Sequence, residues 1–411
     1  MFYFFVIACV LFLLRRRIDS FAIAAIGMAV YYFPIYFDQL FYMDSAANFV
    51  DVGKAANFDL QVGILIVFYA LLLCSWLPPA FPVVKRLYGV NEKATVVLLS
   101  WATFFLSLYI IPVAVGYSNK SDRITSIGIA SVFFGYMFAL STLALLYWGV
   151  GAKSKMSRAV SFFAALYFSG VAIFVFQARS VIIFSWLAFF LYFVYGRKIN
   201  VTSIKLRYFI SLGVIVFVLM GKHLANYFFY GAEYEDWVLV LKDSLESYGI
   251  SSNLNYVYES GLSCFYLHNI VKSLVPLMNV ADSSHFDYHE IIKREVFPDA
   301  IYGMGRNPIG ELWINLKWYG IATYCIILCL KCSVFNFIIL RTTGLLKIFL
   351  VLLLFISVFF FNRNSLQNDV VYLRNYLAFF FGFVLFASVL SGGYVFKSYL
   401  FSREVKCSAQ G

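Results

Sequence analysis

Eleven apolar stretches recur along this sequence, and they constrain its fold more than any other feature. They are 2–14, 18–37, 60–84, 94–115, 125–150, 159–177, 180–196, 208–221, 312–338, 347–361 and 376–396. A helix needs about 20 mostly apolar residues to cross a bilayer. Continuous apolar runs indicate helices, because the strands of a membrane barrel alternate polar and apolar side chains. The sequence therefore predicts an all-α polytopic integral membrane protein with about 11 transmembrane helices, within a range of roughly 10 to 12.

A long polar interruption between residues 222 and 308 divides the chain. It contains all 4 histidines and 11 of the 21 acidic residues. The sequence thus predicts an N-terminal membrane region (1–221, about 8 spans), a large loop (222–308) and a C-terminal membrane region (309–411, about 3 spans). Apolar residues at helical spacing within the loop, such as Leu267, Ile270 and Leu274, favour a folded lid at the membrane surface over a disordered tether.

The distribution of charge predicts the orientation of the spans. Basic clusters, which begin at Arg15, Lys85, Lys153, Arg197, Arg341 and Lys397, fall at every second loop between the apolar stretches. Lys and Arg retained on alternate short loops mark the cytoplasmic face. The large loop is therefore expected to be extracytoplasmic and the C-terminus cytoplasmic. Because the net charge of +11 lies on loops that face membrane lipid, nucleic acid is not expected as a partner.

The most distinctive single residue is Arg179, which interrupts an apolar region from 159 to 196. An Arg at membrane depth costs roughly 2.5–3.5 kcal/mol on insertion scales, so it is retained for a partner or a ligand. A guanidinium beside a helix start is suited to a phosphate group, which it binds through two oxygens. The alternative is an interfacial Arg that contacts lipid headgroups or pairs with a loop carboxylate.

A second polar group follows the large loop, at a predicted helix start. Pro308 favours the first helical turn, and Glu311 and Asn315 are spaced to share one helix face. A carboxylate held there is suited to accept a proton from a sugar hydroxyl, and Arg306 adds a cation directly before the helix. The alternative is an ion pair between Arg306 and Glu311, with ordinary helix capping.

A third polar group lies in the predicted outer turn between the last two spans. Its cations, Arg363 and Arg374, are expected on the same face as Arg179 and Arg306, where the four together would suit a pyrophosphate. The alternative is chance placement at the membrane interface.

The histidines carry a weaker signal than the arginines. His285 and His289 have the i, i+4 spacing of zinc ligands, but the HExxH order and a third ligand are absent from the pattern. No metal site is therefore predicted. His289 remains a second candidate for a general base, and a solvated or packed loop histidine is the alternative.

At these residues the chain resembles the oligosaccharide repeat-unit polymerases of the O-antigen polymerase (Wzy) type. Those proteins are polytopic, bacterial, and carry a large outer loop late in the chain. The matching features are an Arg-Ser turn before an apolar helix, a G-E-x-x-x-N-x-x-x-x-G helix start and a late Arg-bearing outer turn. The first two are carried by Arg179, Ser180, Gly310, Glu311, Asn315 and Gly320. The outer loops of such polymerases also contain an Arg followed, after ten intervening residues, by a Gly, and Arg294 and Gly305 match this spacing.

The resemblance implies a metal-independent glycosyltransferase without a cofactor, in the cytoplasmic (inner) membrane of a bacterium. It would transfer a growing glycan from undecaprenyl pyrophosphate to the terminal sugar of a new lipid-linked repeat unit. Glu311 is the first candidate for the base and His289 the second. The expected substrate-binding residues are Arg179, Arg306, Arg363, Arg374, Asn315 and Arg294. A chain-length regulator protein is an expected partner.

Three other functions remain open from the sequence. An O-antigen ligase-like glycosyltransferase shares this architecture and chemistry. A lipid-linked oligosaccharide flippase is disfavoured, since a transporter would place charges along a cavity at mid-depth, where Lys331 is the exception in this sequence. A structural or sensory membrane protein would leave the four arginines on an acidic face without an explanation.

Overall fold

A computed structural model describes residues 1–15, 17–41, 58–76, 92–115, 126–127, 130–175, 179–196, 307–363 and 366–390. Within these ranges the chain forms helices and no β-strand. Seven helical segments are long and apolar enough to cross a membrane, and three more are shorter apolar helices. The protein is thus an all-α polytopic membrane protein, as the apolar stretches predict.

Two regions of the chain contribute these helices. The N-terminal ones are α1 (Phe2–Leu14), α2 (Ser20–Phe41), α3 (Phe58–Trp76), α4 (Glu92–Val115), α6 (Ala130–Gly151), α7 (Lys155–Gly170), the π-helix η1 (Val171–Val175) and α8 (Arg179–Val194). The C-terminal ones are α14 (Pro308–Leu316), α15 (Trp318–Arg341), α16 (Gly344–Leu354), the π-helix η4 (Phe355–Phe359), the 3₁₀-helix η5 (Phe360–Arg363) and α17 (Leu366–Leu390).

Each predicted apolar stretch except 208–221, which lies outside the described residues, coincides with helical structure. Two boundaries differ from expectation. The stretch 312–338 corresponds to two helices, α14 and α15, which are separated at Lys317. The last helix, α17, begins at Leu366 rather than near residue 376, so that Asp369 and Arg374 belong to a helix and not to a turn. Their polarity hides this helix start from a reading of hydropathy alone.

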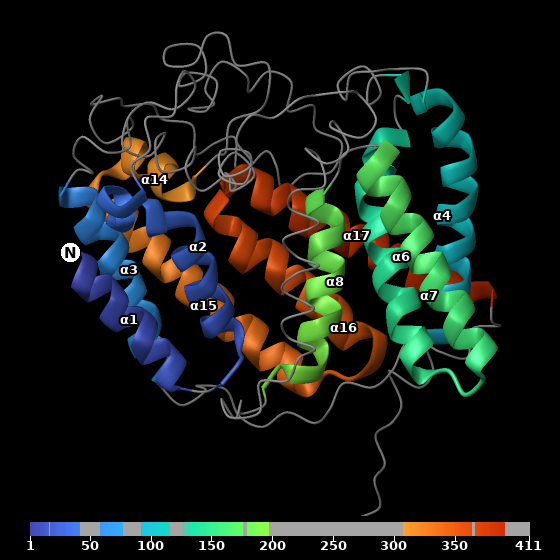
Figure 1. Ribbon diagram of the computed structural model, residues 1–411, viewed down its shortest axis with the longest axis horizontal. Coiled ribbons are helices and arrows are strands. Elements are labelled where there is room, and N and C mark those ends of the chain that lie inside the picture. Colours follow the sequence, from blue (N-terminus) through green and yellow to red (C-terminus); the bar gives the residue numbers. More distant parts are fainter. Residues whose placement is uncertain are drawn as a thin grey trace, which may run out of the picture. The chain divides into compact units, whose positions relative to one another are not determined.

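The chain divides into two compact units, each described by itself. Unit 1 comprises Met1–Val83, Val194–Leu340 and Leu353–Arg374, and unit 2 comprises Val84–Phe193, Arg341–Leu352 and Asn375–Gly411. In unit 1, α1, α2 and α3 lie side by side (Figure 1). Phe5 of α1 stacks on Tyr36 of α2 at 4.5 Å between ring centroids and meets Phe68 of α3 edge-on at 5.7 Å.

Helix α2 also packs tightly on η4 and η5 in unit 1. At Gly27 an added Cβ would lie 3.0 Å from both the Asn362 side-chain amide and the Phe359 carbonyl oxygen. Glycine is therefore what permits this close approach of α2 to the segment before α17.

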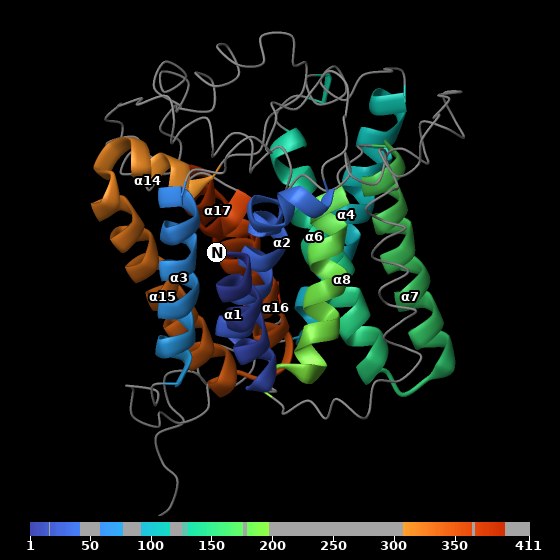
Figure 2. The ribbon, with the colours of Figure 1, turned by 60° about the vertical axis from the view of Figure 1, so that its left-hand side comes forward.

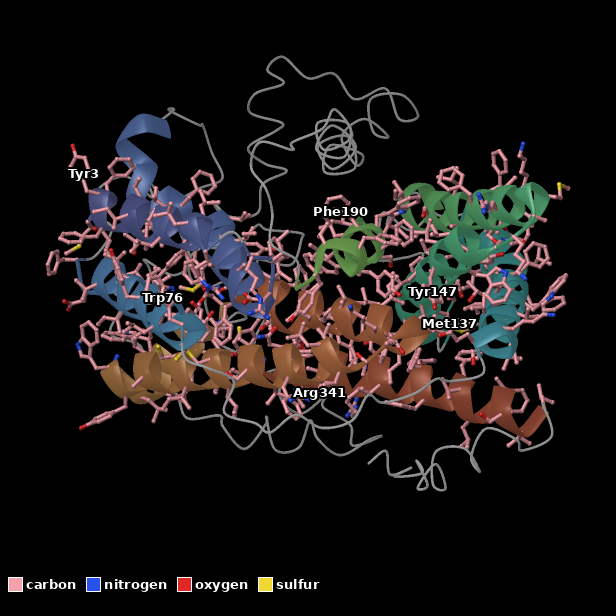
Figure 3. All side chains as sticks on the ribbon, turned by 90° about the horizontal axis from the view of Figure 1, so that it is seen from below. Tyr3, Trp76, Met137, Tyr147, Phe190 and Arg341 are labelled. Carbon is pink, nitrogen blue, oxygen red and sulfur yellow. The ribbon has the colours of Figure 1, made fainter. Side chains whose placement is uncertain are left out.

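In unit 2, α6 packs between α4 and α7. Met137 and Tyr147, labelled in Figure 3, both belong to α6. The hydroxyls of Thr103 and Ser141 lie 2.5 Å apart between α4 and α6. Glu92, at the start of α4, accepts hydrogen bonds from the Tyr147 hydroxyl at 3.0 Å and the Leu345 amide at 2.9 Å. A single carboxylate thus ties three helices of this unit together and caps the first turn of α16.

Candidate functional site

Helix α14 meets α15 at a tight corner at one end of unit 1 (Figures 1 and 2). The corner occurs at Lys317, whose backbone adopts φ 52° and ψ −129°. Gly320, in the first turn of α15, faces the Leu312 carbonyl so closely that an added Cβ would overlap it. Trp313 and Trp318 meet edge-to-face across the same turn, with ring centroids 5.5 Å apart. These contacts set α14 directly against the beginning of α15.

Asn307 connects the N-terminus of α14 to two other elements. Its side-chain oxygen accepts hydrogen bonds from the backbone N–H groups of Ile309 at 2.8 Å and Gly310 at 3.2 Å, as an N-cap does. Its amide donates to the Tyr32 hydroxyl and to the Asn362 carbonyl oxygen, both at 3.0 Å. Asn307 is buried. One side chain therefore caps α14 and joins it to α2 and η5.

Asn362 continues the same network inside η5. Its side-chain oxygen accepts a hydrogen bond from the Tyr324 hydroxyl of α15 at 2.7 Å. Its amide donates to the carbonyls of Val358 at 3.3 Å and Phe359 at 3.2 Å. Because a buried polar network whose members are bonded rigidifies its surroundings, we expect α2, α14, α15 and η5 to be held in one fixed arrangement.

Glu311 lies one turn into α14 and is 2% exposed. Its Oε2 accepts a hydrogen bond from the backbone N–H of Leu366 at 2.6 Å, so the carboxylate caps the first turn of α17. The Asn315 amide donates to the Glu311 carbonyl oxygen at 2.7 Å, one turn further along α14. The spacing of these two residues on one helix is as predicted, and the capping of α17 is a role that spacing alone does not indicate.

Two of the predicted arginines fall at the boundaries of helices. Arg179 is the first residue of α8 in unit 2, and Arg363 is the last residue of η5 in unit 1. Arg374 lies half-buried in α17. Arg306, directly before Asn307, lies outside the described residues, as do His289 and Arg294 of the large loop. The proximity of the arginines to one another stays a prediction.

Two groups of the network were not singled out by the sequence: the Tyr32 and Tyr324 hydroxyls. Both tyrosines are fully buried in apolar helices. A tyrosine in an apolar stretch is expected to pack in the hydrophobic core. The sequence pattern therefore does not predict the hydrogen bonds of the two hydroxyls.

Within the described ranges, no three His, Cys, Asp or Glu residues form a group that could hold a metal ion. The pair His285 and His289 lies outside these ranges.

No protein-family model, curated protein or solved structure matches this chain.

Substitution of Asn307 should separate its two roles. Asn307→Ala removes the N-cap and leaves the Tyr32 hydroxyl and the Asn362 carbonyl without this donor, and we expect a loss of about 3 kcal/mol. Asn307→Asp retains the cap acceptor but places a carboxylate oxygen against the buried Asn362 carbonyl oxygen, so it should also be less stable than wild type. Thermal unfolding of the purified protein in detergent measures both effects.

The matched control is Thr323→Ala, which removes an exposed hydrogen bond to the Tyr319 carbonyl on α15. It should change stability by less than about 0.5 kcal/mol. An Asn307→Asp protein as stable as wild type would show that the bonds to α2 and η5 contribute nothing.

Proposed function

We propose that this protein is a bacterial glycan polymerase of the O-antigen or capsule type. It joins undecaprenyl-pyrophosphate-linked oligosaccharide repeat units at the outer face of the cytoplasmic membrane. The observation that carries the proposal is the hydrogen bond of Asn307 with the Asn362 carbonyl oxygen, at 3.0 Å. It joins two chain positions that each adjoin a predicted substrate-binding arginine.

Arg306 directly precedes Asn307, and Arg363 directly follows Asn362. Since consecutive Cα atoms are only about 3.8 Å apart, this hydrogen bond between the neighbouring residues supports the proposal that Arg306 and Arg363 act on the same substrate. Two guanidinium groups suit a pyrophosphate, because each binds phosphate oxygens through a planar fork of donors. They would stabilise the negative charge that develops on the leaving pyrophosphate.

Glu311 supports the proposal from the same part of unit 1. Its carboxylate binds the Leu366 amide, only three residues after Arg363. A base and a cationic leaving-group site in such proximity are what glycosyl transfer to a hydroxyl requires. His289 in the large loop is the second candidate for the base.

In the proposed reaction, the bond between the anomeric carbon of the growing glycan and its pyrophosphate breaks. The terminal hydroxyl oxygen of the incoming lipid-linked repeat bonds to that carbon. Its proton passes to the base, and undecaprenyl pyrophosphate leaves with the bonding electrons. The energy comes from the donor, so no cofactor and no metal is needed. Arg179, Arg374, Arg294 and Asn315 would bind the remaining parts of the two glycolipids.

The proposed location is the bacterial inner membrane, with the loop 222–308 outside and the C-terminus in the cytoplasm. The positive charges on alternate loops support this orientation. It places the loop where it would cover the reacting glycans and exclude water, whose attack would release the chain by hydrolysis. A chain-length regulator would act at the same face.

Deletion of the gene in its own host tests the proposal. We expect the ladder of long surface glycolipids on a gel to collapse to a core that carries a single repeat unit. The wild-type gene on a plasmid should restore the ladder. If even the single repeat vanishes, a polymerase is excluded, and a ligase or a flippase becomes the better explanation.

A further inference from the structure

A buried ion pair lies inside the apolar helices of unit 1. The Lys331 ammonium of α15 lies 2.5 Å from Asp369 Oδ2 of α17, and the two side chains are 20% and 5% exposed. At a rise of 1.5 Å per residue, Lys331 is about 20 Å along α15 from Trp318 and about 15 Å from Arg341. Charged side chains at such depth are rare and are retained for a specific purpose.

Lys331 has further contacts that hold the segment before α17. Its ammonium donates to the Ser357 carbonyl oxygen at 3.3 Å and lies 3.6 Å from the centroid of the Phe361 ring. Ser357 belongs to the π-helix η4 and Phe361 to η5. Short π-helical turns often occur at functional sites. A single ammonium thus joins α15, η4, η5 and α17.

One chain of contacts leads from this pair to the residue beside Arg363. The Phe361 ring stacks on Tyr324, with centroids 5.5 Å apart and planes at 13°. The Tyr324 hydroxyl in turn donates to the Asn362 side-chain oxygen at 2.7 Å. Asn362 immediately precedes Arg363 in the chain.

A second chain of contacts leads from the pair to Glu311. Asp369 lies in the first turn of α17, and the backbone N–H of Leu366 in the same turn donates to Glu311 Oε2. The position of α17 is therefore linked to the ion pair on one side and to the candidate base on the other.

We propose that the Lys331–Asp369 ion pair positions the elements that form the pyrophosphate site. It fixes η5 and the start of α17, and so sets the backbone at Arg363 relative to Glu311. This inference rests on the proposed function, because the site it positions is the one assigned there. The competing explanation is that the pair only stabilises the fold.

A double variant without either charge, Lys331→Met with Asp369→Asn, tests whether the pair positions the site or only stabilises the fold. Lys331→Met alone leaves a buried carboxylate without its cation and should unfold readily. The double variant removes both charges and should recover much of that stability. The probe is farnesyl pyrophosphate, a short isoprenyl pyrophosphate. The readout is its apparent dissociation constant, obtained from the rise of the unfolding temperature with probe concentration in detergent.

We expect this dissociation constant to rise at least about tenfold in the double variant, which corresponds to about 1.4 kcal/mol of binding free energy. Lys331→Arg keeps the cation and should stay within about threefold of wild type. Asp369→Glu, which keeps the charge but shifts the carboxylate by one methylene, should fold and bind more weakly.

The matched control is the Arg15–Asp19 pair, which lies among the described residues of unit 1. Its atoms are 2.7 Å apart, with side chains 10% and 1% exposed. The corresponding neutral double variant, Arg15→Met with Asp19→Asn, should lose stability and keep the wild-type dissociation constant for the probe.

The inference is overturned if the double variant or Asp369→Glu folds and binds the probe like wild type. The proposed function is unaffected by that result. The wild-type protein could fail to bind the probe although deletion of the gene collapses the glycan ladder. In that case the double variant and Asp369→Glu are tested for ladder synthesis in the deletion strain. A normal ladder from either variant overturns the inference. If the ladder survives deletion, the proposed function fails, and the inference fails with it.

Discussion

Glu311→Gln is expected to abolish the long glycan ladder while the protein stays folded. A general base contributes roughly 10²- to 10⁴-fold to a rate, and an amide cannot take the proton of the acceptor hydroxyl. The Gln side-chain oxygen can still accept the Leu366 N–H that Glu311 Oε2 now binds at 2.6 Å. The cap on α17 is thereby kept, although its charge is lost. The measurement is the gel of surface glycolipids from the deletion strain carrying this variant, alongside the amount of protein in the membrane.

Glu311→Ala provides the comparison, because it removes the base and the cap together. It should also lower the free energy of unfolding by about 1–3 kcal/mol, since the Leu366 amide loses a charged acceptor. A full ladder from Glu311→Gln would contradict the role of Glu311 as a base. Glu311 would then be a capping residue only, and His289 would be the next side chain to replace.

The membrane helices could be predicted from the sequence because a bilayer imposes a simple requirement. Each span must be about 20 apolar residues long and must satisfy its own backbone hydrogen bonds. The start of α17 was placed about three turns too late because polar residues such as Asp369 and Arg374 lie within the helix. Asp369 is accommodated there by Lys331, which comes from another helix.

The turn between α14 and α15 was hidden for a different reason. The residues around it are apolar enough to extend one continuous span, and the turn occurs at Lys317, a residue type that rarely adopts positive φ. A glycine at this position would have indicated the turn. The conformation is supported instead by the close packing of Gly320 on Leu312, which a linear pattern does not reveal.

The candidate site was predictable only in its local parts. Glu311 and Asn315 share one helix, so their spacing suffices to relate them. The bond of Asn307 to Tyr32 spans 275 residues of sequence, and that of Asn362 to Tyr324 spans 38. Contacts of this kind depend on how the helices pack. The sequence therefore indicated the polar residues near α14 that are candidates for the site, but not the tyrosines that form hydrogen bonds with the asparagines beside them.

Gly320→Ala should disrupt both the fold and the candidate site. The added Cβ would overlap the Leu312 carbonyl, a backbone group that cannot rotate away. Overpacking typically costs about 1–3 kcal/mol, and an immovable neighbour places this substitution at about 3 kcal/mol. To relieve the overlap, α14 must move from α15, which carries Asn307 and Glu311 away from η5 and α17. We therefore expect a lower unfolding temperature in detergent together with loss of the glycan ladder.

The matched control is Gly382→Ala in α17, where an added Cβ would meet nothing within 4 Å. Alanine favours a helix over glycine by up to about 1 kcal/mol, so this variant should be as stable as wild type or slightly more stable, with a normal ladder. If Gly320→Ala behaved like Gly382→Ala, the close contact between α14 and α15 would not exist in the protein. The placement of Glu311 against α17 would then lose its structural basis, because that placement depends on the tight turn between α14 and α15.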